Sequence, residues 1–475
     1  MMVGELLRRR FEESRDDVLL VTKERQSLTY GQALSNAQRL ATEWTAQGAE
    51  RGDAIALVLA NDVSFPCCYL ACLLGGFIAV PINPELGEET VAFILSMAAP
   101  AITLRSPPPI NHQCAPLNGC EFPIDDSSCG AVFFTSGTTG KPKGVRHSWL
   151  TLMGNVAAFN RLMRIQRQTR MYHVLPMAYM AGFLNTILSP LVAGGTVILG
   201  PRFSPATALD FWAQPAREAA NAIWVTPSIA AAIARLTRDQ HAACRAAAAF
   251  DTVLCGTAPL PSGIRRTFLE QFGVPLQESY GTSELLLISA QSRAQAELMG
   301  ADAGTPLAEL EIAFRRDSEG RDEIMVRSPF ALLDYLTHDG PASAPVSDDG
   351  FVPTGDVGKL DKGVLQITGR IKDIIIRGGI NISPRTVEDA LGDLPGVEDV
   401  AVIGVPHEFW GEKLVACIET APQADKEKVE AAVRQRCRER LARSHQPDHI
   451  AVLAMFPRAV TGKVQKHVLQ QSFAE

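Results

Sequence analysis

The sequence lacks the cysteine pattern of a metal-binding or disulfide-linked protein. Its 10 cysteines are scattered over 475 residues without a CxxC pair, and none has the histidine spacing of a zinc site. Because disulfides persist mainly in oxidising compartments, reduced thiols in the cytoplasm are the simpler interpretation. The first residues carry charges of both signs and no apolar core, so we expect a surface helix there and not a signal peptide.

The chain also lacks an excess of positive charge and long uninterrupted hydrophobic runs. The 45 Lys and Arg residues are outnumbered by 52 Asp and Glu residues, so the composition predicts no general affinity for nucleic acid or anionic membranes. Two stretches, 63–82 and 171–201, are almost without charge, but prolines and glycines interrupt both. A membrane-spanning helix needs about 20 consecutive apolar residues. We therefore expect buried helices and strands in these stretches and no membrane span.

What the chain does show is an alternation of strand and helix patterns. Short β-branched runs such as 54–59 and 195–199 alternate with amphipathic segments such as 89–97 and 228–236. This alternation is typical of parallel sheets with helices on both faces, which places the chain in the α/β class.

The length and a change of pattern predict two domains. A chain of 475 residues exceeds what a single core usually supports. Around residues 309–368 the pattern changes to short strands separated by turns, and an α+β pattern follows. We predict a large N-terminal domain over residues 1–370, which includes this β-rich subdomain, and a small C-terminal domain over 371–475.

The most informative motif is a loop rich in glycine, hydroxyl groups and lysine. It consists of Thr135, Ser136, Gly137, Thr138, Thr139, Gly140, Lys141, Pro142 and Lys143. Glycines let the backbone turn its N–H groups inward, hydroxyls add donors and lysines neutralise charge, so the loop suits a polyphosphate. It is not the common nucleotide P-loop, because Pro142 stands where that motif has Ser or Thr.

Further motifs follow this loop in order. Residues 280–284 read Tyr-Gly-Thr-Ser-Glu, residues 354–356 read Thr-Gly-Asp, and 457–466 contain Lys463. Together they resemble the motifs of the acyl-adenylate-forming superfamily, which includes acyl-CoA synthetases, nonribosomal-peptide adenylation domains and luciferases. The resemblance covers most of the chain and is greatest to acyl-CoA synthetases. Taken alone, residues 280–284 and 354–356 would each pass for an ordinary turn.

This resemblance implies an ATP and Mg²⁺ site in the N-terminal domain. The glycine-rich loop is expected to bind the β- and γ-phosphates. Tyr280 is expected to stack beside adenine, Thr282 to contact the α-phosphate and Glu284 to bind Mg²⁺, which prefers oxygen ligands. The remaining expected nucleotide contacts are Gly256, Thr257 and Ala258 beside adenine, Gly281 in the turn, Asp356 on the ribose hydroxyls and Arg370 on ribose or phosphate.

The resemblance also implies that the C-terminal domain is mobile. Lys372 occupies the hinge position about which this domain turns, and Gly378 and Gly379 are expected to lie beside the channel for the thiol substrate. Lys463 is the expected catalytic lysine, together with Thr282 and Glu284. A point charge that reaches the reacting groups only on closure stabilises the transition state preferentially.

The implied chemistry has two steps. A substrate carboxylate attacks the α-phosphorus of ATP to give acyl-AMP and pyrophosphate, and a thiol then attacks the acyl carbonyl and expels AMP. No protein nucleophile is required, and the sequence has no recognisable Ser/His/Asp or Cys/His arrangement. We expect CoA as the thiol. The alternatives are an enzyme that loads an acyl or amino acyl group onto the phosphopantetheine of an acyl or peptidyl carrier protein, and an inactive relative that only binds nucleotide or acyl-adenylate.

The segment expected to recognise the acid departs from the family's usual pattern. Tyr179 stands where many acyl-CoA synthetases have His and amino-acid activators have Asp, and no carboxylate lies within 171–201. An α-amino acid would therefore lack its usual counter-charge. The expected wall of the acyl pocket is Tyr179, Met180 and Trp224, which favours an apolar or aromatic small-molecule acid.

Overall fold

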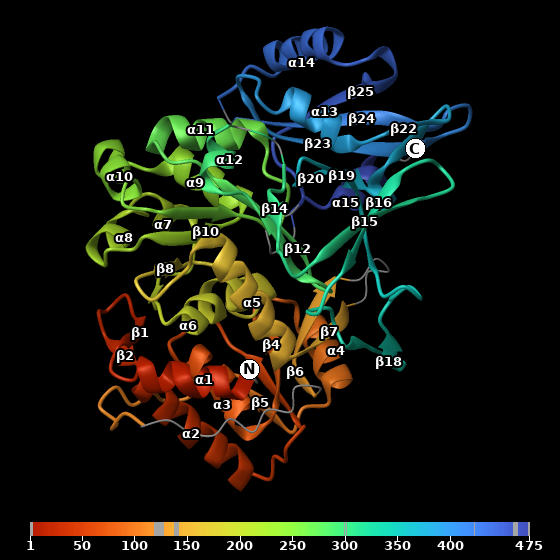
Figure 1. Cartoon of the computed structure of the whole chain (residues 1–475). Coiled ribbons are helices and arrows are strands. Elements are labelled where there is room, and N and C mark those ends of the chain that lie inside the picture. The colour runs from red at the N-terminus through yellow and green to blue at the C-terminus, as the bar shows by residue number, and fades with distance from the viewer. Residues whose placement is uncertain are drawn as a thin grey trace.

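Helices and strands alternate along the first 300 residues of the computed structural model (Figure 1). The structure describes residues 3–117, 128–136, 142–298, 300, 302–421, 423–458 and 464–473. Local signals explain many boundaries. For example, the helix α2 begins with a capping box, in which the side chain of Thr29 accepts from the backbone N–H of Gln32 and Gln32 returns a bond to the backbone of Thr29.

The largest sheet has nine strands in the order β14-β13-β12-β11-β10-β8-β9-β1-β2. Neighbouring strands pair in parallel from β12 through β1, whereas the pairs β12–β13 and β13–β14 at one end and β1–β2 at the other are antiparallel. Strands buried on both faces are typical of parallel sheets covered by helices. The strands are β1 (Val18–Val21), β2 (Ser27–Thr29), β8 (Arg170–His173), β9 (Thr196–Leu199), β10 (Ala222–Val225), β11 (Thr252–Cys255), β12 (Gln277–Thr282), β13 (Leu286–Ala290) and β14 (Thr305–Pro306).

A second sheet of seven strands has the order β18-β17-β7-β6-β4-β3-β5. Its strands β3, β4, β5 and β6 pair in parallel, and β6 forms an antiparallel hairpin with β7. The strands are β3 (Ala54–Val58), β4 (Ile78–Ile82), β5 (Ile102–Leu104), β6 (Cys129–Ser136), β7 (Pro142–Ser148), β17 (Asp334–Thr337) and β18 (Gly340–Ser343).

Helices pack on these two sheets, and apolar side chains from helix and sheet form the core between them. Among them, α5 lies between the two sheets and contributes to the core on both sides (Figure 1). The helices are α1 (Val3–Glu13), α2 (Tyr30–Ala46), α3 (Ser64–Gly75), α4 (Glu88–Ala98), α5 (Trp149–Met163), the π-helix η1 (Ala181–Leu188), α6 (Ser189–Ala193), α7 (Pro205–Ala208), α8 (Ala213–Arg217), α9 (Pro227–Leu236), α10 (Gln240–Ala247), α11 (Ser262–Phe272) and α12 (Arg293–Glu297).

The predicted β-rich subdomain is present as a four-stranded antiparallel sheet. It contains β15 (Glu311–Arg316), β16 (Asp322–Arg327), β19 (Val352–Asp361) and β20 (Val364–Arg370). Strands β17 and β18 come from the same stretch of sequence but join the seven-stranded sheet, because β17 pairs with β7. The sequence pattern alone did not show that strands from this stretch belong to two different sheets.

A small C-terminal α+β domain follows, as the sequence predicted. Its five-stranded sheet has its own core and lies beside α11 and α12 of the N-terminal domain (Figure 1). Its elements are the 3-10 helix η2 (Ile371–Asp373), β21 (Ile375–Arg377), β22 (Ile380–Ile382), α13 (Pro384–Leu391), β23 (Val397–His407), β24 (Gly411–Thr420), α14 (Lys426–Arg440), the 3-10 helix η3 (Arg443–His445), β25 (His449–Leu453) and α15 (Lys466–Ser472).

The nearly uncharged stretch at 63–82 forms α3, a break and β4, as expected. The break falls at Gly76, whose φ of 68° lies in the left-handed region that glycine favours. Within the described part of the chain, no helix combines the length and apolar character needed to cross a membrane.

Candidate active site

The two ends of the glycine-rich loop pair with each other in the β6–β7 hairpin. Thr135 is paired with Lys143 across this hairpin, and Ser136 with Pro142. The predicted phosphate-binding residues Gly137, Thr138, Thr139, Gly140 and Lys141 lie outside the described residues. The hairpin therefore places Thr135 and Lys143 opposite each other at the two ends of the loop.

Lys143 contacts the predicted metal residue Glu284. The ammonium group of Lys143 donates to Oε1 of Glu284 at 2.9 Å, and the hydroxyl of Tyr335 donates to the same oxygen at 3.0 Å. Lys143 Nζ also lies 4.0 Å from the centre of the Tyr335 ring, within the range of a cation–π contact. Strands β7 and β17 and the turn after β12 thus converge on one carboxylate.

The turn that carries Glu284 is held from both sides. Nε2 of His147 donates to the backbone carbonyl of Ser283 at 2.8 Å, and Oγ1 of Thr282 accepts from the backbone N–H of Leu285 at 3.1 Å. Because burial disfavours the charged imidazolium, the pKa of His147 falls to about 4. His147 is therefore a neutral donor at physiological pH.

Only glycine fits at position 281, one of the predicted nucleotide contacts. A Cβ atom there would lie 2.2 Å from the backbone oxygen of Leu286 on the neighbouring strand. The close approach of β12 and β13 thus explains the glycine in the Tyr-Gly-Thr-Ser-Glu motif.

The predicted adenine and ribose residues form one hydrogen-bonded chain. The hydroxyl of Tyr280 donates to Oδ2 of Asp356 at 2.7 Å, and Nε of Arg370 donates to Oδ1 at 2.8 Å. Asp356 is almost fully buried, whereas half of the Arg370 side chain is exposed. Burial, reinforced by the neighbouring carboxylate, raises the pKa of Tyr280 well above its usual value. Tyr280 is therefore a proton donor to Asp356 throughout the physiological range.

Gly256, Thr257 and Ala258 lie at the end of β11, one strand from β12. A Cβ at Gly256 would lie 2.4 Å from Oγ of Ser279 and 3.2 Å from Nε1 of Trp224, so side chains of both neighbouring strands crowd this glycine. Thr257 is exposed and has a φ of 72°, a conformation that costs a β-branched residue energy. The structure thus places Trp224 beside the predicted adenine segment.

The predicted acyl wall is made of residues with different environments. Tyr179 and Met180 are half-buried at the start of η1, and the hydroxyl of Tyr179 accepts from Nδ2 of Asn83 at 3.2 Å. Trp224 is fully buried and stacks on Phe159, with 5.2 Å between ring centres. Its environment is that of a core residue that also borders the site.

The segment before Tyr179 is fixed by Asn61. Nδ2 of Asn61 donates to the carbonyl of Leu175, and its Oδ1 accepts from the backbone N–H of Met177, both at 2.8 Å. At Gly182, a Cβ would lie 2.0 Å from the carbonyl oxygen of Pro176, so the chain folds tightly back on itself. The π-helix that follows is a rare element that often marks functional sites.

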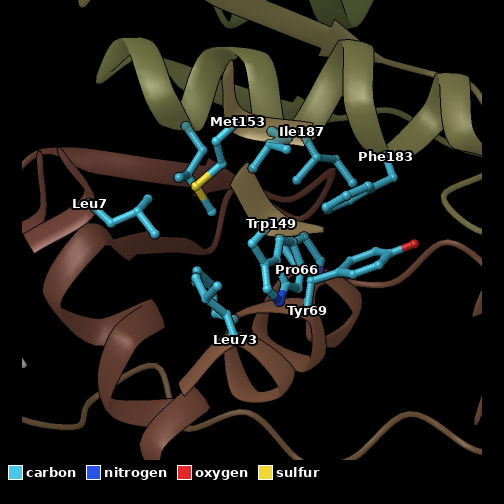
Figure 2. Close-up of a pocket in the computed structure, with 11 residues that line it drawn as sticks. Leu7, Pro66, Tyr69, Leu73, Trp149, Met153, Phe183 and Ile187 are labelled. Carbon is cyan, nitrogen blue, oxygen red and sulfur yellow. The ribbon is translucent and has the colours of Figure 1, made fainter. Parts of the chain in front are cut away.

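A small apolar cavity lies behind η1 (Figure 2). Its volume is about 10 Å³, and no charged side chain lines it. The Tyr69 and Phe183 rings stack at 3.8 Å between centres, while Leu7 and Met153 lie on the far side in Figure 2. The interior next to the predicted acyl wall is therefore apolar and nearly filled.

The predicted residues of the C-terminal domain are exposed or not described. Lys372 is exposed in η2, two residues after Arg370. Gly378 and Gly379 form the two-residue turn between β21 and β22, and their φ values of 56° and 78° are those of a type I′ hairpin. Lys463 lies outside the described residues.

Sequence reasoning missed several residues that contact the predicted ones. Tyr335, His147 and Asn61 belong to no motif, and each lies more than 50 residues from its partner along the chain. No local signal in the sequence distinguishes them from ordinary polar residues. Within the described part of the chain, no group of three or more His, Cys, Asp or Glu side chains forms a metal site.

Family models match both domains. The model described as "AMP-binding enzyme" matches residues 7–336, and the model "AMP-binding enzyme C-terminal domain" matches residues 386–463. The long-chain-fatty-acid–CoA ligase FadD13 of Mycobacterium tuberculosis is 30% identical, over 94% of this chain and 93% of its own.

Solved structures agree with this match. The o-succinylbenzoate CoA synthetase MenE of Bacillus subtilis, in complex with its acyl-adenylate intermediate, has a TM-score of 0.82 at 26% identity, over 98% of each chain. ATP-bound MatB of Rhodopseudomonas palustris has a TM-score of 0.86 at 24% identity, over 100% of this chain and 99% of that chain, and its apo form has a TM-score of 0.78. By the match of its sequence over both domains, this chain belongs to the AMP-binding enzyme family.

Proposed function

We propose that this enzyme is an AMP-forming ligase that activates a predominantly apolar carboxylic acid, with no charge besides its carboxylate, with ATP and joins it to CoA. One observation carries the proposal. Strand β12 and the turn after it bring Tyr280 to Asp356 and Glu284 to Lys143, so candidate nucleotide and metal residues from separate parts of the chain meet on one strand. Family membership and the CoA ligases among its relatives support the reaction type.

In the first step, a carboxylate oxygen of the acid forms a bond to the α-phosphorus of ATP, and the bond to the β-phosphate oxygen breaks. Pyrophosphate leaves with the electron pair of that bond. We assign Lys143 and the loop from Thr135 to the β- and γ-phosphates, Asp356 to the ribose hydroxyls and Tyr280 to adenine. Positioning and charge neutralisation then supply most of the rate.

In the second step, the sulfur of CoA forms a bond to the acyl carbon, and the bond to the AMP oxygen breaks. We assign the approach of the thiol to the side of the Gly378–Gly379 turn. Rotation of the C-terminal domain about Lys372 separates the two steps, and Lys463 serves the first one. These roles follow from the positions of the residues in the family's motifs.

Glu284 is the residue we assign to Mg²⁺. Its carboxylate offers the oxygen ligands that Mg²⁺ prefers, and Mg²⁺ is usually held by one or two carboxylates plus substrate phosphates. A single acidic residue is therefore enough. When bound, Mg²⁺ neutralises charge on the phosphates as pyrophosphate leaves.

The acid we propose is apolar because no charged side chain lines the cavity behind η1. The side chains around the cavity in Figure 2 are apolar or aromatic, and the Tyr179 hydroxyl already accepts a hydrogen bond from Nδ2 of Asn83. An acid with a second charge would have to bury it without a partner, which is costly. The long-chain acid named for FadD13 is consistent with this chemistry.

The domain boundary and the location of the enzyme are also part of the proposal. Arg370 ends β20, and the next strand, β21, belongs to the C-terminal sheet, which supports a boundary at residue 370. The nine cysteines that the structure describes are all free thiols, which supports a reducing compartment such as the cytoplasm.

A pyrophosphate-release screen over fatty, aryl and amino acids tests the proposal, with CoA and carrier proteins supplied separately. We expect release with apolar acids, a CoA thioester as product, and loss of release in Lys463→Ala. Absence of release across the whole panel would refute the activity. Acylation of a carrier protein without any CoA thioester would refute the proposal that CoA is the acceptor.

A further inference from the structure

Arg385 connects the C-terminal domain to the strand that carries the candidate nucleotide residues. It lies at the start of α13, and its Nη2 is 3.6 Å from Oε1 of Glu278 on β12. Both side chains are largely removed from solvent, with 13% of Arg385 and 6% of Glu278 exposed. Glu278 is two residues before Tyr280, so this contact reaches the site directly through the backbone of β12.

Each domain also contains a partner for its own half of this contact. In the N-terminal domain, Nη2 of Arg265 lies 2.7 Å from Oε2 of Glu278. In the C-terminal domain, Nε of Arg385 lies 3.6 Å from Oδ2 of Asp389, one helical turn along α13. The four charges cancel, with one positive and one negative charge in each domain.

This distribution of charge makes the contact easy to break and remake. A buried charge that loses its only partner is strongly destabilising. If the C-terminal domain moves away, Glu278 keeps Arg265 and Arg385 keeps Asp389, so neither domain is left with an unpaired charge. The two domains also approach each other closely at one backbone position, where a Cβ at Gly263 would lie 2.5 Å from the backbone oxygen of Gly392.

Near this contact, the last residue before the predicted boundary also touches the site. Arg370 is bonded to Asp356, which in turn accepts from Tyr280 of β12. The arrangement of domains in this structure is therefore the one in which β12, the candidate ribose carboxylate and the C-terminal domain are joined.

We propose that Arg385 is a positioning residue that holds the C-terminal domain against β12 for formation of the acyl-adenylate, and that Asp389 keeps this hold reversible. The inference rests on the proposed function, in which the domain turns between the two steps. Arg385 acts through Glu278 and the orientation of the domain, and it forms no bond to substrate.

Two substitutions test the proposal because they change the two steps in opposite directions. Arg385→Met leaves Asp389 facing Glu278, so it favours separation of the domains and slows acid-dependent pyrophosphate release about fivefold to tenfold. Asp389→Asn leaves Arg385 with Glu278 as its only partner, so it tightens the hold and slows transfer from preformed acyl-adenylate to CoA by a similar factor. Because lysine keeps the positive charge, Arg385→Lys should retain most of the pyrophosphate release that Arg385→Met loses.

Arg266→Met is the matched control. Arg266 also spans the domains, with Nη1 3.4 Å from Oδ2 of Asp393, but 43% of its side chain is exposed. Exposed ion pairs contribute little, so we expect a change of less than about twofold in either step. If Arg385→Met and Arg266→Met behave alike, or if Arg385→Met and Asp389→Asn slow the same step, the proposal is wrong.

A measurement without catalysis separates this inference from the proposed function. We expect trypsin to cleave the segment 370–377 faster in Arg385→Met than in the wild-type enzyme, and more slowly in Asp389→Asn. Equal cleavage rates in the three proteins would overturn the role of Arg385. A wild-type enzyme without pyrophosphate release would overturn the function while this readout still tests the hold.

Discussion

The ammonium group of Lys143 lies 2.9 Å from the carboxylate of Glu284, although 141 residues separate them in the sequence. This contact joins the end of the glycine-rich loop to the turn after β12. A divalent cation that binds Glu284 has to compete with Lys143 for the same carboxylate, because like charges at this distance repel. Lys143 therefore links the phosphate site to the metal site.

Replacing Lys143 should change metal binding and turnover in opposite directions. In Lys143→Met, Glu284 has lost its positive neighbour, so we expect Mn²⁺ alone to bind about threefold to tenfold more tightly, or up to roughly 1.4 kcal/mol. Pyrophosphate release should fall, because a cation next to the phosphates is lost. Calorimetry with Mn²⁺ measures the first effect. Tyr335→Phe removes a neutral donor from the same oxygen but keeps the charge of Lys143, so it should raise Mn²⁺ affinity less than Lys143→Met does; equal or weaker Mn²⁺ binding in Lys143→Met than in the wild-type enzyme would argue against this competition.

Asp356→Asn should weaken ATP binding, although the asparagine side chain has nearly the same size and shape as aspartate. The substitution removes the negative charge between the Tyr280 hydroxyl and the Arg370 guanidinium. Hydrogen bonds to charged groups are worth about 1.5–3 kcal/mol, so we expect a loss of roughly tenfold to hundredfold in affinity for a non-hydrolysable ATP analogue. Calorimetric titration measures it.

The control for that experiment is Asp322→Asn. Asp322 lies in the same four-stranded sheet and makes an exposed pair with Arg316 at 3.0 Å. It should leave ATP affinity unchanged. Equal affinities of Asp356→Asn and the wild-type enzyme would remove Asp356 from the nucleotide site.

Buried His147 should make the fold sensitive to acid. Burial lowers its pKa to about 4 in the folded protein, against about 6.5 in the unfolded chain. The unfolded state therefore binds the proton first, and stability present above pH 6.5 is lost as the pH falls toward 4. Between pH 7 and pH 5 this residue accounts for a loss of about 2 kcal/mol in the free energy of unfolding.

His147→Gln tests this dependence, because glutamine keeps a donor for the Ser283 carbonyl and does not titrate. We expect the difference in unfolding free energy between pH 7 and pH 5, measured by urea denaturation, to shrink by about 2 kcal/mol. Exposed His241 provides the control, and His241→Gln should leave the difference unchanged. An identical pH dependence in His147→Gln and wild type would contradict the effect of burial.

Thr257→Gly should stabilise the protein. Its φ of 72° costs a side chain with a branched Cβ roughly 1–2 kcal/mol. Glycine avoids this cost, but it loses more conformational freedom on folding, which lowers stability by about 0.5–1 kcal/mol. The net gain is about 0.5–1 kcal/mol in the free energy of unfolding. Ala258→Gly, at a neighbour without positive φ, should lower it by about 0.5–1 kcal/mol. Two shifts of the same sign in urea denaturation would contradict this account.

Local sequence patterns predicted most elements well. The run at 54–59 is the strand β3 (Ala54–Val58), and the amphipathic segment at 89–97 is the helix α4 (Glu88–Ala98). The β-rich stretch was less well predicted, because the pairing of β17 with β7 joins residues almost 190 apart. Strand patterns predict that a segment is extended, but they do not specify its partner.

Part of the candidate site could likewise be predicted from the sequence, and part could not. The order of its motifs, with Tyr280, Glu284, Asp356 and Lys463, follows from the sequence alone, because backbone turns and phosphate chemistry require particular residue types at fixed spacing. The sequence likewise determined the family and the type of reaction. These properties depend on residues that are close together along the chain.

Only the tertiary structure revealed which residues support that site. Tyr335 and His147 reach the Glu284 turn from other strands, and Arg385 reaches Glu278 from another domain. Each is a common polar residue whose role depends on burial and on a partner far along the chain. The energies of such contacts arise from packing in three dimensions, and for that reason no local sequence pattern predicts them.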